Sequence, residues 1–305
     1  MAPMDPLVVA VVLNWNQPEE TADCVASLLA GDYPRQETLV VDNGSTDASV
    51  SQLRGRFGEQ IRIVETGTNL YYAGGNNIGL RWALEAGATW VLILNNDTVV
   101  APDMVSILVQ AGADDYCAGV LAPMIYYADD RVRIWALGSQ RHPWLPMPRD
   151  IGRGEIDRGQ YATPFDVDYV TGCAMMLRQT VLTQVGFFDP SYQMYFEDAD
   201  LCARAQRAGF GLWVEPRAKM WHRVSLTSKR QASTTQYQKT RYRVRFYRQH
   251  PHGPLKGLTH AVLCLQELTR SGAALMRGQR GLAQAGLRGL RDGYREKIEK
   301  RSGSQ

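Results

Sequence analysis

Three apolar stretches of the sequence each end in a cluster of polar residues that can bind ligands or metal ions. The stretches 7–13, 38–42 and 90–95 lead into Asn14-Trp15-Asn16, Asp42-Asn43-Gly44 and Asn95-Asn96-Asp97. A carboxylate at the open end of a buried strand, such as that of Asp97, can bind a hard divalent cation alongside phosphate oxygens. The alternative is a turn, because Asn and Asp also end strands by hydrogen bonding to their own backbone.

Asp42 is open to a similar pair of interpretations. Asn-Gly followed by Ser-Thr-Asp at 43–47 is good turn and helix-capping chemistry. At the end of a strand, however, the carboxylate of Asp42 can accept the imide N–H of a uracil or thymine ring. The position of Asp42 after an apolar run makes a ligand role worth testing.

The stretch 69–80, which precedes a predicted helix, is rich in glycine and asparagine. Its candidate ligand-binding residues are Asn69, Gly74, Gly75, Asn76 and Asn77. Backbone N–H groups at a glycine-rich helix start can bind a diphosphate. The spacing matches neither the dinucleotide fingerprint nor a P-loop. Glycines that let a loop pack tightly are the structural alternative.

Two later stretches carry further titratable groups. Glu197, Asp198 and Asp200 crowd the first turn of a helix predicted over 195–210, where the helix dipole favours negative charge. Capping explains one or two acids, but three repel one another, so an acid here can instead act as general base on an acceptor hydroxyl. His222 can complete a metal site, act as acid or base, or have a structural role only.

The pattern of apolar residues predicts the elements that position these groups. Continuous β-branched runs at 7–13, 38–42, 61–65 and 90–95 alternate with helical spacing at 17–30, after Ser49 and at about 75–86. This alternation is typical of an α/β fold with a doubly wound, mainly parallel sheet. Ligands of such sheets bind beyond the carboxyl ends of the strands, where the polar clusters lie.

The second half of the sequence is less regular. Strands are predicted at 119–127 and 165–170, and an irregular excursion rich in Gly, Pro and Arg at 137–163 is expected to lie on the acceptor side. After Trp221 the sequence becomes basic, with leucines at helical spacing: Leu258, Leu265 and Leu268 with Val262, then Leu282, Leu287 and Leu290. A helical C-terminal appendage follows from this pattern.

Composition narrows the class of protein. The chain has 305 residues, 45% of them hydrophobic, which is enough for a full core. Its five cysteines are widely spaced and form no CxxC pair, which favours a reducing cytosol over a disulfide or zinc framework. Neither a signal peptide nor a transmembrane span is predicted.

The positive charge is concentrated at the C-terminal end. From Arg223 onward there are eighteen Lys and Arg against four acids. Helices of this composition can lie on an anionic membrane surface. The alternative is that they pack on the catalytic domain and keep a solvated basic face. No nucleic-acid partner is expected, because no recognised binding module accompanies the basic tail.

The order of the motifs is more specific than any one of them. The segments VVLNWN, VVDNGSTD, NLYYAGGNNIGL, LILNNDTVV, YFEDADLCARAQRAGF and WHRVSLTS, in this order, resemble family 2 glycosyltransferases of the bacterial rhamnosyltransferase-like branch. The resemblance covers residues 7–228. It implies a GT-A catalytic domain at 1–228, with a nucleotide-sugar half at about 1–100 and an acceptor half at about 101–228. Residues 229–305 form the basic helical C-terminal region.

The resemblance also assigns roles to residues. Asp42 would contact the nucleotide base, with the backbone around Leu13 and Asn14 lining the same pocket, and 69–77 would close over the donor. Asn95-Asn96-Asp97 takes the place of the family's Asp-x-Asp motif, with Asp97 as the acid that binds Mg²⁺ or Mn²⁺. Asn95 stands where the motif has its first Asp, which removes one negative charge, and His222 would compensate in part. Asp198 would be the catalytic base, supported by Glu197.

The implied reaction is an inverting transfer from a nucleoside-diphosphate sugar, with L-rhamnose from dTDP-rhamnose as the leading donor. The acceptor would be a glycan or a polyprenyl-diphosphate-linked sugar in cell-surface polysaccharide synthesis. The enzyme would work in the cytoplasm, at the inner face of the cytoplasmic membrane if the tail binds lipid. A non-catalytic nucleotide-sugar-binding or scaffold protein is the alternative from another class. A sugar nucleotidyltransferase is disfavoured, because its glycine-rich, basic N-terminal segment is absent after residue 13.

Overall fold

The computed structural model describes residues 5–114, 118–142, 148–224, 232–251 and 256–298. Its contacts divide the chain into two compact units. Unit 1 comprises residues up to 140, 149–193 and 197–224, and unit 2 comprises 141–148, 194–196 and the residues from 225 onward. The sequence placed one boundary at residue 228. The contacts place the corresponding boundary after Val224 and assign two short internal segments to unit 2.

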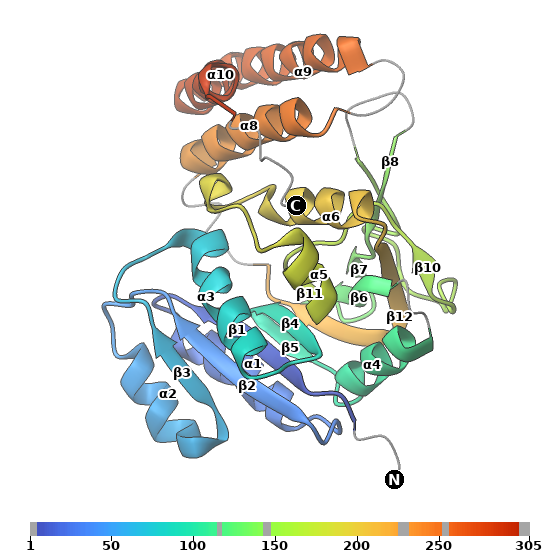
Figure 1. Ribbon diagram of the computed structural model, residues 1–305. Coiled ribbons are helices and arrows are strands. Elements are labelled where there is room, and N and C mark those ends of the chain that lie inside the picture. The colour runs from blue at the N-terminus through green and yellow to red at the C-terminus, as the bar shows by residue number, and fades with distance from the viewer. Residues whose placement is uncertain (1–4, 115–117, 143–147, 225–231, 252–255, 299–305) are drawn as a thin grey trace. The chain divides into compact units, whose positions relative to one another are not determined.

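A mixed sheet forms the centre of unit 1 (Figure 1). Its first half is parallel, in the order β4-β1-β2-β3, with strands β1 (Val8–Asn14), β2 (Gln36–Asp42), β3 (Arg62–Glu65) and β4 (Trp90–Asn95). Within this register Asn14 lies opposite Asp42, and Leu13 lies opposite Asn95. The polar clusters at the strand ends therefore share one edge of the sheet, as predicted.

The second half of the sheet is mixed. It continues from β4 in the order β11-β6-β12-β10, with β11 antiparallel to β4 and to β6, and β12 parallel to β6. The bounds are β5 (Thr98–Val100), β6 (Ala118–Tyr127), β7 (Ile134–Ala136), β10 (Phe165–Asp166), β11 (Ala174–Arg178) and β12 (Gly211–His222). β5 pairs with β12, and β7 pairs with β6. Strands β8 (Ser139–Arg141) and β9 (Pro148–Asp150) form a separate two-stranded sheet.

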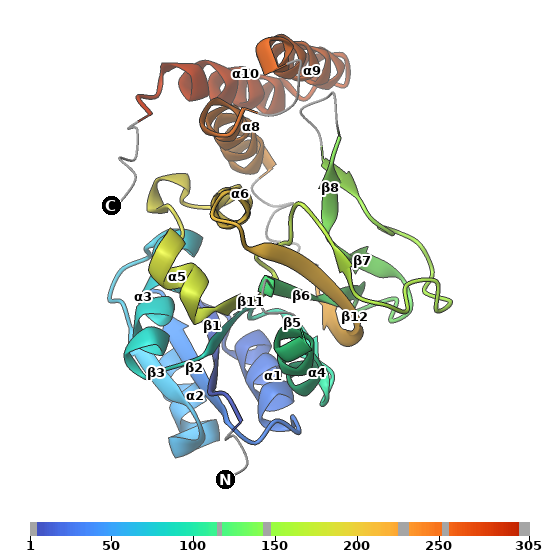
Figure 2. The same ribbon diagram turned by 45° about the vertical axis from the view of Figure 1, so that its right-hand side comes forward.

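Helices cover both faces of the unit 1 sheet, because alternate residues of β1 point to opposite sides (Figure 2). Val9 and Val11 pack against residues of α3 (Tyr71–Glu85), α5 (Gln179–Val185) and α6 (Glu197–Arg207). Val8, Ala10 and Val12 pack against α1 (Pro18–Leu29) and α4 (Met104–Asp114). A smaller cluster joins α1 to α2 (Ser49–Phe57). This is the doubly wound α/β arrangement that the sequence predicts.

Three predicted elements differ from the structure. The helix expected from about Gly75 begins at Tyr71, four residues earlier. The strand expected over 165–170 is limited to Phe165–Asp166, because the N–H groups of Asp168 and Tyr169 bond to the carbonyl of Ser139 and not to β12. The excursion 137–163 contains β8 and β9, although residues 143–147 lie outside the described part of the chain.

The short strands β5, β7, β8 and β9 were not predicted, and neither were the longer strands β11 and β12. β11 is rich in methionine, and β12 carries Glu215, Pro216, Arg217 and Lys219, so neither shows a strand pattern. The irregular pairing of β12 between Glu215 and Lys219 accommodates Pro216. Tertiary pairing therefore decides both strands, and β12 also shows that the helical region begins only after Trp221 and His222.

The described residues of unit 2 include the helices α8 (Ala232–Gln249), α9 (Lys256–Met276) and α10 (Arg280–Arg295). α10 packs closely on α8 through glycines. A Cβ on Gly289 would lie 2.5 Å from the carbonyl oxygen of Tyr237, and one on Gly293 would lie 2.7 Å from that of Arg241. Three of the leucines whose spacing predicts this helix, Leu258, Leu265 and Leu268, are more than half exposed on α9.

We expect Gly79→Ala and Gly55→Ala to have opposite effects on stability. Both glycines lie inside helices of unit 1, where alanine is favoured by up to about 1 kcal/mol. A Cβ on Gly79 would overlap Val11, which is fully buried in β1, whereas a Cβ on Gly55 would meet no atom within 4 Å. Overpacking costs about 1–3 kcal/mol. Urea unfolding should therefore show Gly79→Ala below the wild type and Gly55→Ala at or above it, and equal stability of the two variants would contradict this packing.

Candidate active site

Asn14 and Asp42 form a rigid pair at the ends of β1 and β2. Asn14 Nδ2 donates to Asp42 Oδ1 at 2.8 Å and to Ser45 Oγ at 3.1 Å, and the backbone N–H of Ser45 donates to Asp42 Oδ2 at 3.0 Å. Asn14 Oδ1 in turn accepts from Thr21 Oγ1 at 2.7 Å. Both side chains are buried. Each carboxylate oxygen can accept a second hydrogen bond, so Asp42 is fixed in position and can still receive a ligand N–H.

The loop after β2 holds the start of α3. Asn43 Oδ1 accepts from the N–H of Leu70 at 2.9 Å, and Asn43 Nδ2 donates to Asn69 Oδ1 at 3.2 Å. Asn69 Oδ1 also accepts from the N–H of Tyr71 at 2.7 Å. Gly44 has a φ of 74°, and a Cβ there would lie 2.6 Å from the backbone of Thr68. Sequence reasoning missed Asn43 as a positioning residue. Asn69 orders the start of α3, the segment that the sequence predicts to close over the donor.

The predicted phosphate-binding role of Gly74 and Gly75 is wrong in its structural basis. They lie past the first turn of α3, where backbone N–H groups bond within the helix and are not available to a ligand. A Cβ on Gly75 would lie 2.6 Å from Leu13, so this glycine permits close packing of α3 on β1. The structural alternative therefore accounts for these glycines.

Asn76 and Asn77 are also inside α3 and buried. The side chain of Asn77 both donates to and accepts from the backbone of Phe188, at 2.9 and 3.0 Å. Asn76 Nδ2 donates to the carbonyl of Tyr72 at 3.0 Å, while its Oδ1 has no hydrogen-bond partner among the described residues. Both polar atoms of the Asn77 side chain therefore hold the backbone of Phe188, and a role of this residue in donor binding stays a prediction.

Asn95, Asn96 and Asp97 form the turn between β4 and β5. The carbonyl of Asn95 accepts from Thr98 Oγ1 at 2.7 Å, and Asn96 Nδ2 donates to Gln17 Oε1 at 3.1 Å and Thr21 Oγ1 at 3.0 Å. The two asparagines are thus tied to the turn and to α1. This arrangement directs the third member, Asp97, toward β12.

Asp97 and His222 are brought together because β5 pairs antiparallel with β12, with Thr98 opposite His222. The N–H of Arg223 donates to the carbonyl of Asp97 at 2.8 Å. The side chains meet with His222 Nε2 at 3.1 Å from Asp97 Oδ1. The edge of His222 also packs against Trp135, with ring centroids 4.4 Å apart. The sequence placed both residues at a metal site, and the structure makes them neighbours.

The chemistry of this pair fits a divalent cation. Asp97 Oδ1 and His222 Nδ1 are buried and have no hydrogen-bond partner among the described residues. Two ligands that each lie about 2.1 Å from one cation at right angles are separated by about 3 Å, close to the spacing of Oδ1 and Nε2. No group of three or more His, Cys, Asp or Glu side chains suited to a metal occurs in the described part of the chain. Phosphate oxygens of a ligand would have to complete the coordination.

Asp198 is the most firmly held acid of unit 1. Its Oδ2 accepts from the hydroxyl of Tyr169 at 2.7 Å and from the N–H of Gly172 at 2.9 Å, and its Oδ1 accepts from the N–H of Ala199 at 2.8 Å. Burial raises the pKa of Asp198 above its ordinary value, and these donors limit the rise. A carboxylate with a raised pKa and a fixed orientation can act as a general base.

Glu197 differs from its neighbour. Burial, followed by the charge of Asp198, raises the pKa of Glu197 well above its ordinary value. Its Oε2 is buried and has no hydrogen-bond partner among the described residues. Two adjacent buried carboxyls disfavour a second charge, and the larger rise in pKa falls on Glu197, so Glu197 holds a proton more tightly than Asp198.

Gly172 and Cys173 connect the two halves of the site. The N–H of Gly172 donates to Asp198, and the carbonyl of Cys173 accepts from the N–H of Asn95 at 3.0 Å. Tyr72 Oη donates to the carbonyl of Gly172 at 2.6 Å. Burial and the charges of Asp97 and Asp198 raise the pKa of Cys173, so this thiol stays neutral between the two acids. Sequence reasoning missed Tyr72, Tyr169 and Gly172, because no spacing rule links them to residue 198.

Comparison with known sequences identifies the family. The model of glycosyl transferase family 2 matches residues 9–186. The chain belongs to glycosyl transferase family 2. It is 27% identical over 243 residues to the N-acetylglucosaminyl-diphospho-decaprenol L-rhamnosyltransferase of Mycobacterium tuberculosis, which spans 72% of this chain and 76% of the relative. It is 30% identical over 205 residues to a low-salt glycan biosynthesis hexosyltransferase of Haloferax volcanii, which spans 66% and 62%.

Solved structures agree on the fold. A mannosyltransferase from Pyrobaculum calidifontis, in complex with GDP-Man and Mn²⁺, aligns with a TM-score of 0.60 at 16% identity. The alignment covers 95% of this chain and 88% of that one. The protein is therefore a GT-A glycosyltransferase with a helical C-terminal region. The family match ends at residue 186, so the roles of Glu197, Asp198 and His222 rest on the contacts described above.

Glu197→Gln should alter the pH dependence of stability. The folded protein retains the Glu197 proton well above the ordinary pKa of 4.5, whereas the unfolded chain loses it near that value. Unfolding therefore releases a proton, and the wild type loses stability as pH rises from about 4.5 toward the raised pKa. Glutamine does not titrate, so the melting temperature of the variant should improve relative to the wild type over this range. A difference that stays constant from about pH 4 to about pH 8 would contradict the raised pKa.

Proposed function

We propose that this glycosyltransferase is an inverting enzyme that transfers L-rhamnose from dTDP-rhamnose to a hydroxyl of a polyprenyl-diphosphate-linked glycan. The observation that carries the proposal is the Gly172–Cys173 connection, which ties the fixed base Asp198 to the turn that bears Asp97. Base and metal ligand thus occupy one rigid site. The name of the Mycobacterium tuberculosis relative supports the choice of sugar and of acceptor.

At the donor end, Asp42 accepts the imide N–H of the thymine ring. Its carboxylate is held by Asn14 and Ser45, so little side-chain entropy remains to be lost when the base binds. The backbone of Leu13 and Asn14 lines the same pocket. Cytosine presents an unprotonated N3 in place of this N–H, so the contact disfavours cytosine nucleotides.

At the phosphate end, Asp97 and His222 would hold Mg²⁺ or Mn²⁺. When bound, the cation would supply positive charge against the negative charge that grows on the leaving diphosphate. A cation is also needed for binding, because Asp97 and Asp198 would otherwise repel the diphosphate. Asn95 keeps the turn in shape through its backbone N–H and carbonyl, which does not require an acid at this position.

The reaction is a single displacement. Asp198 accepts the proton of the acceptor hydroxyl as the new C–O bond forms at the anomeric carbon, and the nucleoside diphosphate departs from the opposite face. Tyr169 and the N–H of Gly172 keep the Asp198 carboxylate directed and ionised. Glu197 stays protonated and therefore adds no charge that would raise the pKa of the base further. No covalent intermediate is needed.

The protein acts at the cytoplasmic face of the membrane in this proposal, because a polyprenyl-linked acceptor is embedded there. No helix in the described ranges has the length and apolar character to cross a bilayer. Contact with the membrane would therefore be peripheral, through the basic C-terminal region.

Asp198→Asn should abolish transfer while preserving donor binding. Asparagine keeps the shape of the side chain but cannot take the proton, so kcat should fall by about 10²–10⁴-fold, the usual contribution of a general base. The dissociation constant for dTDP should stay within about twofold of the wild type, because Asp198 acts on the acceptor. Transfer is measured with dTDP-rhamnose and an N-acetylglucosaminyl-diphospho-polyprenol. Near-normal turnover of the folded variant would remove Asp198 from this role.

Asp97→Asn and Asp42→Asn should separate metal binding from base recognition. The wild type should bind dTDP more tightly with Mn²⁺ than with a chelator. In Asp97→Asn we expect this metal effect to disappear, with roughly 10–100-fold weaker binding in Mn²⁺. In Asp42→Asn the affinity should fall but keep its dependence on Mn²⁺. Isothermal titration in both conditions makes the comparison.

Three outcomes would contradict the assignments. A metal effect that persists in Asp97→Asn would exclude Asp97 as the ligand. Unchanged dTDP affinity in Asp42→Asn would exclude the base contact. Tight binding of donor by the wild type without any transfer to the lipid-linked acceptor would favour a non-catalytic nucleotide-sugar-binding protein.

A further inference from the structure

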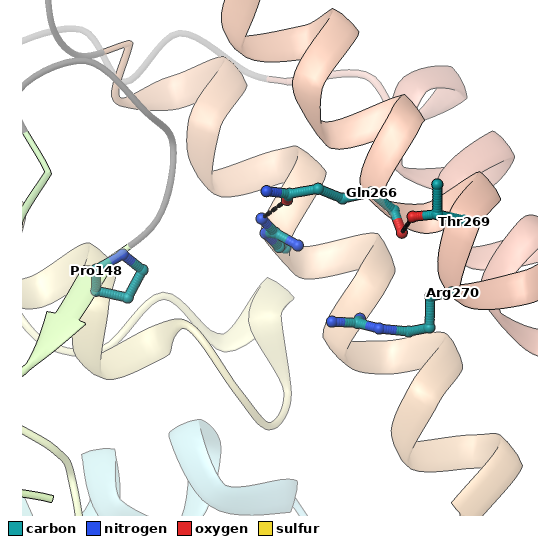
Figure 3. Close-up of a pocket in the computed structure, with 5 residues that line it drawn as sticks. Pro148, Gln266, Thr269 and Arg270 are labelled. Atoms are coloured by element: carbon teal, nitrogen blue, oxygen red, sulfur yellow. Dashed lines mark hydrogen bonds between the residues drawn. The ribbon is translucent and has the colours of Figure 1, made fainter. Parts of the chain in front are cut away.

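A pocket of about 600 Å³ lies within unit 2, and none of the residues that line it is assigned to the transfer reaction. Figure 3 shows Pro148 on one side and the α9 residues Gln266, Thr269 and Arg270 on the other. Arg243 of α8 completes the lining and donates to Gln266 Oε1. The polar groups of this pocket are thus two guanidiniums, an amide and a hydroxyl.

The charge of the pocket is positive. Burial and the nearby charge of Arg270 lower the pKa of Arg243 from its ordinary value. Arg141, also in unit 2, lies close enough to Tyr247 to act on its pKa together with Arg243. The nearby acid is Glu267, 3.5 Å from Arg270. Its carboxylate already accepts hydrogen bonds from Gln236, Thr240 and Ser271, so it offsets the arginines only in part.

Such a lining matches a phosphoryl group. Arginine presents several N–H donors in a planar fork that suits phosphate oxygens, and amide and hydroxyl groups add further donors. An anion between Arg243 and Arg270 would relieve the repulsion between the two guanidiniums. The pocket is lined by side chains from two packed helices, which keeps it in shape without the ligand.

An exposed apolar stripe runs along α9 beside this pocket. Leu258, Leu265, Leu268 and Leu275 are 56%, 63%, 55% and 51% exposed, and Met276 is 85% exposed. At about 100° per residue these side chains share one face of the helix. The same helical spacing places Thr269 beside Leu258 and Met276 around the helix axis, so the pocket borders the stripe. An apolar helix face next to a basic pocket complements a lipid, which has an acyl chain and a phosphoryl headgroup.

We propose that α9 lies on the membrane surface through this stripe and that the pocket binds the phosphoryl headgroup of a membrane lipid. The headgroup is that of an anionic phospholipid or the diphosphate of a polyprenyl lipid, which share this chemistry. The second source rests on the proposed function, because it would be the acceptor itself. The first holds the enzyme at the membrane whatever sugar it transfers.

Arg270→Gln and Arg277→Gln test the pocket against general charge. Both arginines have exposed side chains, they are seven residues apart, and only Arg270 lines the pocket. We measure co-sedimentation of the full chain with three vesicles: phosphatidylcholine alone, phosphatidylcholine with phosphatidylglycerol, and phosphatidylcholine with undecaprenyl diphosphate. Arg270→Gln should lose at least fivefold in affinity for the vesicles that the wild type binds, and Arg277→Gln less than twofold. Arg243→Gln/Arg270→Gln should lose more, provided that its melting temperature is unchanged.

The vesicle that supports binding identifies the lipid. Preference for phosphatidylglycerol points to a membrane anchor, and preference for undecaprenyl diphosphate points to the acceptor. Equal losses in Arg270→Gln and Arg277→Gln, or no binding of the wild type to either charged vesicle, would overturn the proposal.

The stripe is tested by Leu265→Gln/Leu268→Gln, which should also lose vesicle binding. A wild-type dimer that this variant converts to a monomer would instead make the stripe an interface between two copies and would overturn its assignment to the membrane. Metal-dependent hydrolysis of dTDP-rhamnose by the wild type, measured in the same preparation, reports on unit 1 alone. Failure of lipid binding with hydrolysis intact therefore leaves the transferase proposal standing.

Discussion

The site depends on the register of β4 with its two neighbours. Because β4 runs parallel to β1, its end at Asn95 lies level with Leu13 and beside the Asn14–Asp42 pair. Because β11 runs antiparallel to β4, the residues that precede β11 arrive at the same edge of the sheet. The hydrogen bond from the N–H of Asn95 to the carbonyl of Cys173 fixes this arrangement. A shift of one residue would turn every side chain of β4 to the opposite face.

Three proposed functions meet at this edge because the sheet changes from parallel to antiparallel there. The parallel half supplies Asn14 and Asp42, which we propose as the nucleotide side. The turn after β4 supplies Asp97, and its partner His222 comes from the far end of β12 through the short strand β5. The antiparallel strand β11 brings Gly172 to Asp198. A wholly parallel sheet would place a crossover helix where Gly172 and Cys173 lie.

The parallel half could be predicted from the sequence, because each of its strands is a continuous apolar run and each helix has regular spacing. The roles of Asp97, Asp198 and His222 came from the order of the motifs. The glycines of 69–80 led us to predict a diphosphate-binding loop. Glycine in a helix that packs closely on a strand cannot be distinguished in sequence from glycine in such a loop. β11 and β12 could not be predicted, because their residues have no strand pattern and their pairing partners are far away in sequence. The contact between Tyr169 and Asp198 depends on that pairing, so it could not be predicted while the pairing was unknown.

The α9 leucines show a second limit of prediction from sequence. Their spacing predicts a helix, and α9 is one, but spacing alone does not say whether an apolar face is buried or exposed. In unit 2 the buried face of α10 is made by Ala283 and three glycines, since only small residues allow α10 to approach α8 (at Gly289 and Gly293) and α9 (at Gly286) so closely. The leucines of α9 are left outside, and their exposure is a property of the fold that composition does not reveal.

We propose that Asp97, in the turn after β4, and His222, at the end of β12, hold one cation at the donor diphosphate. Crystals grown with dTDP and Mn²⁺, with diffraction collected at the manganese absorption edge, test it most directly. We expect a single strong anomalous peak in contact with Asp97, His222 and both phosphates of dTDP. A peak bound to the diphosphate but remote from both side chains, or dTDP bound without any peak, would contradict it.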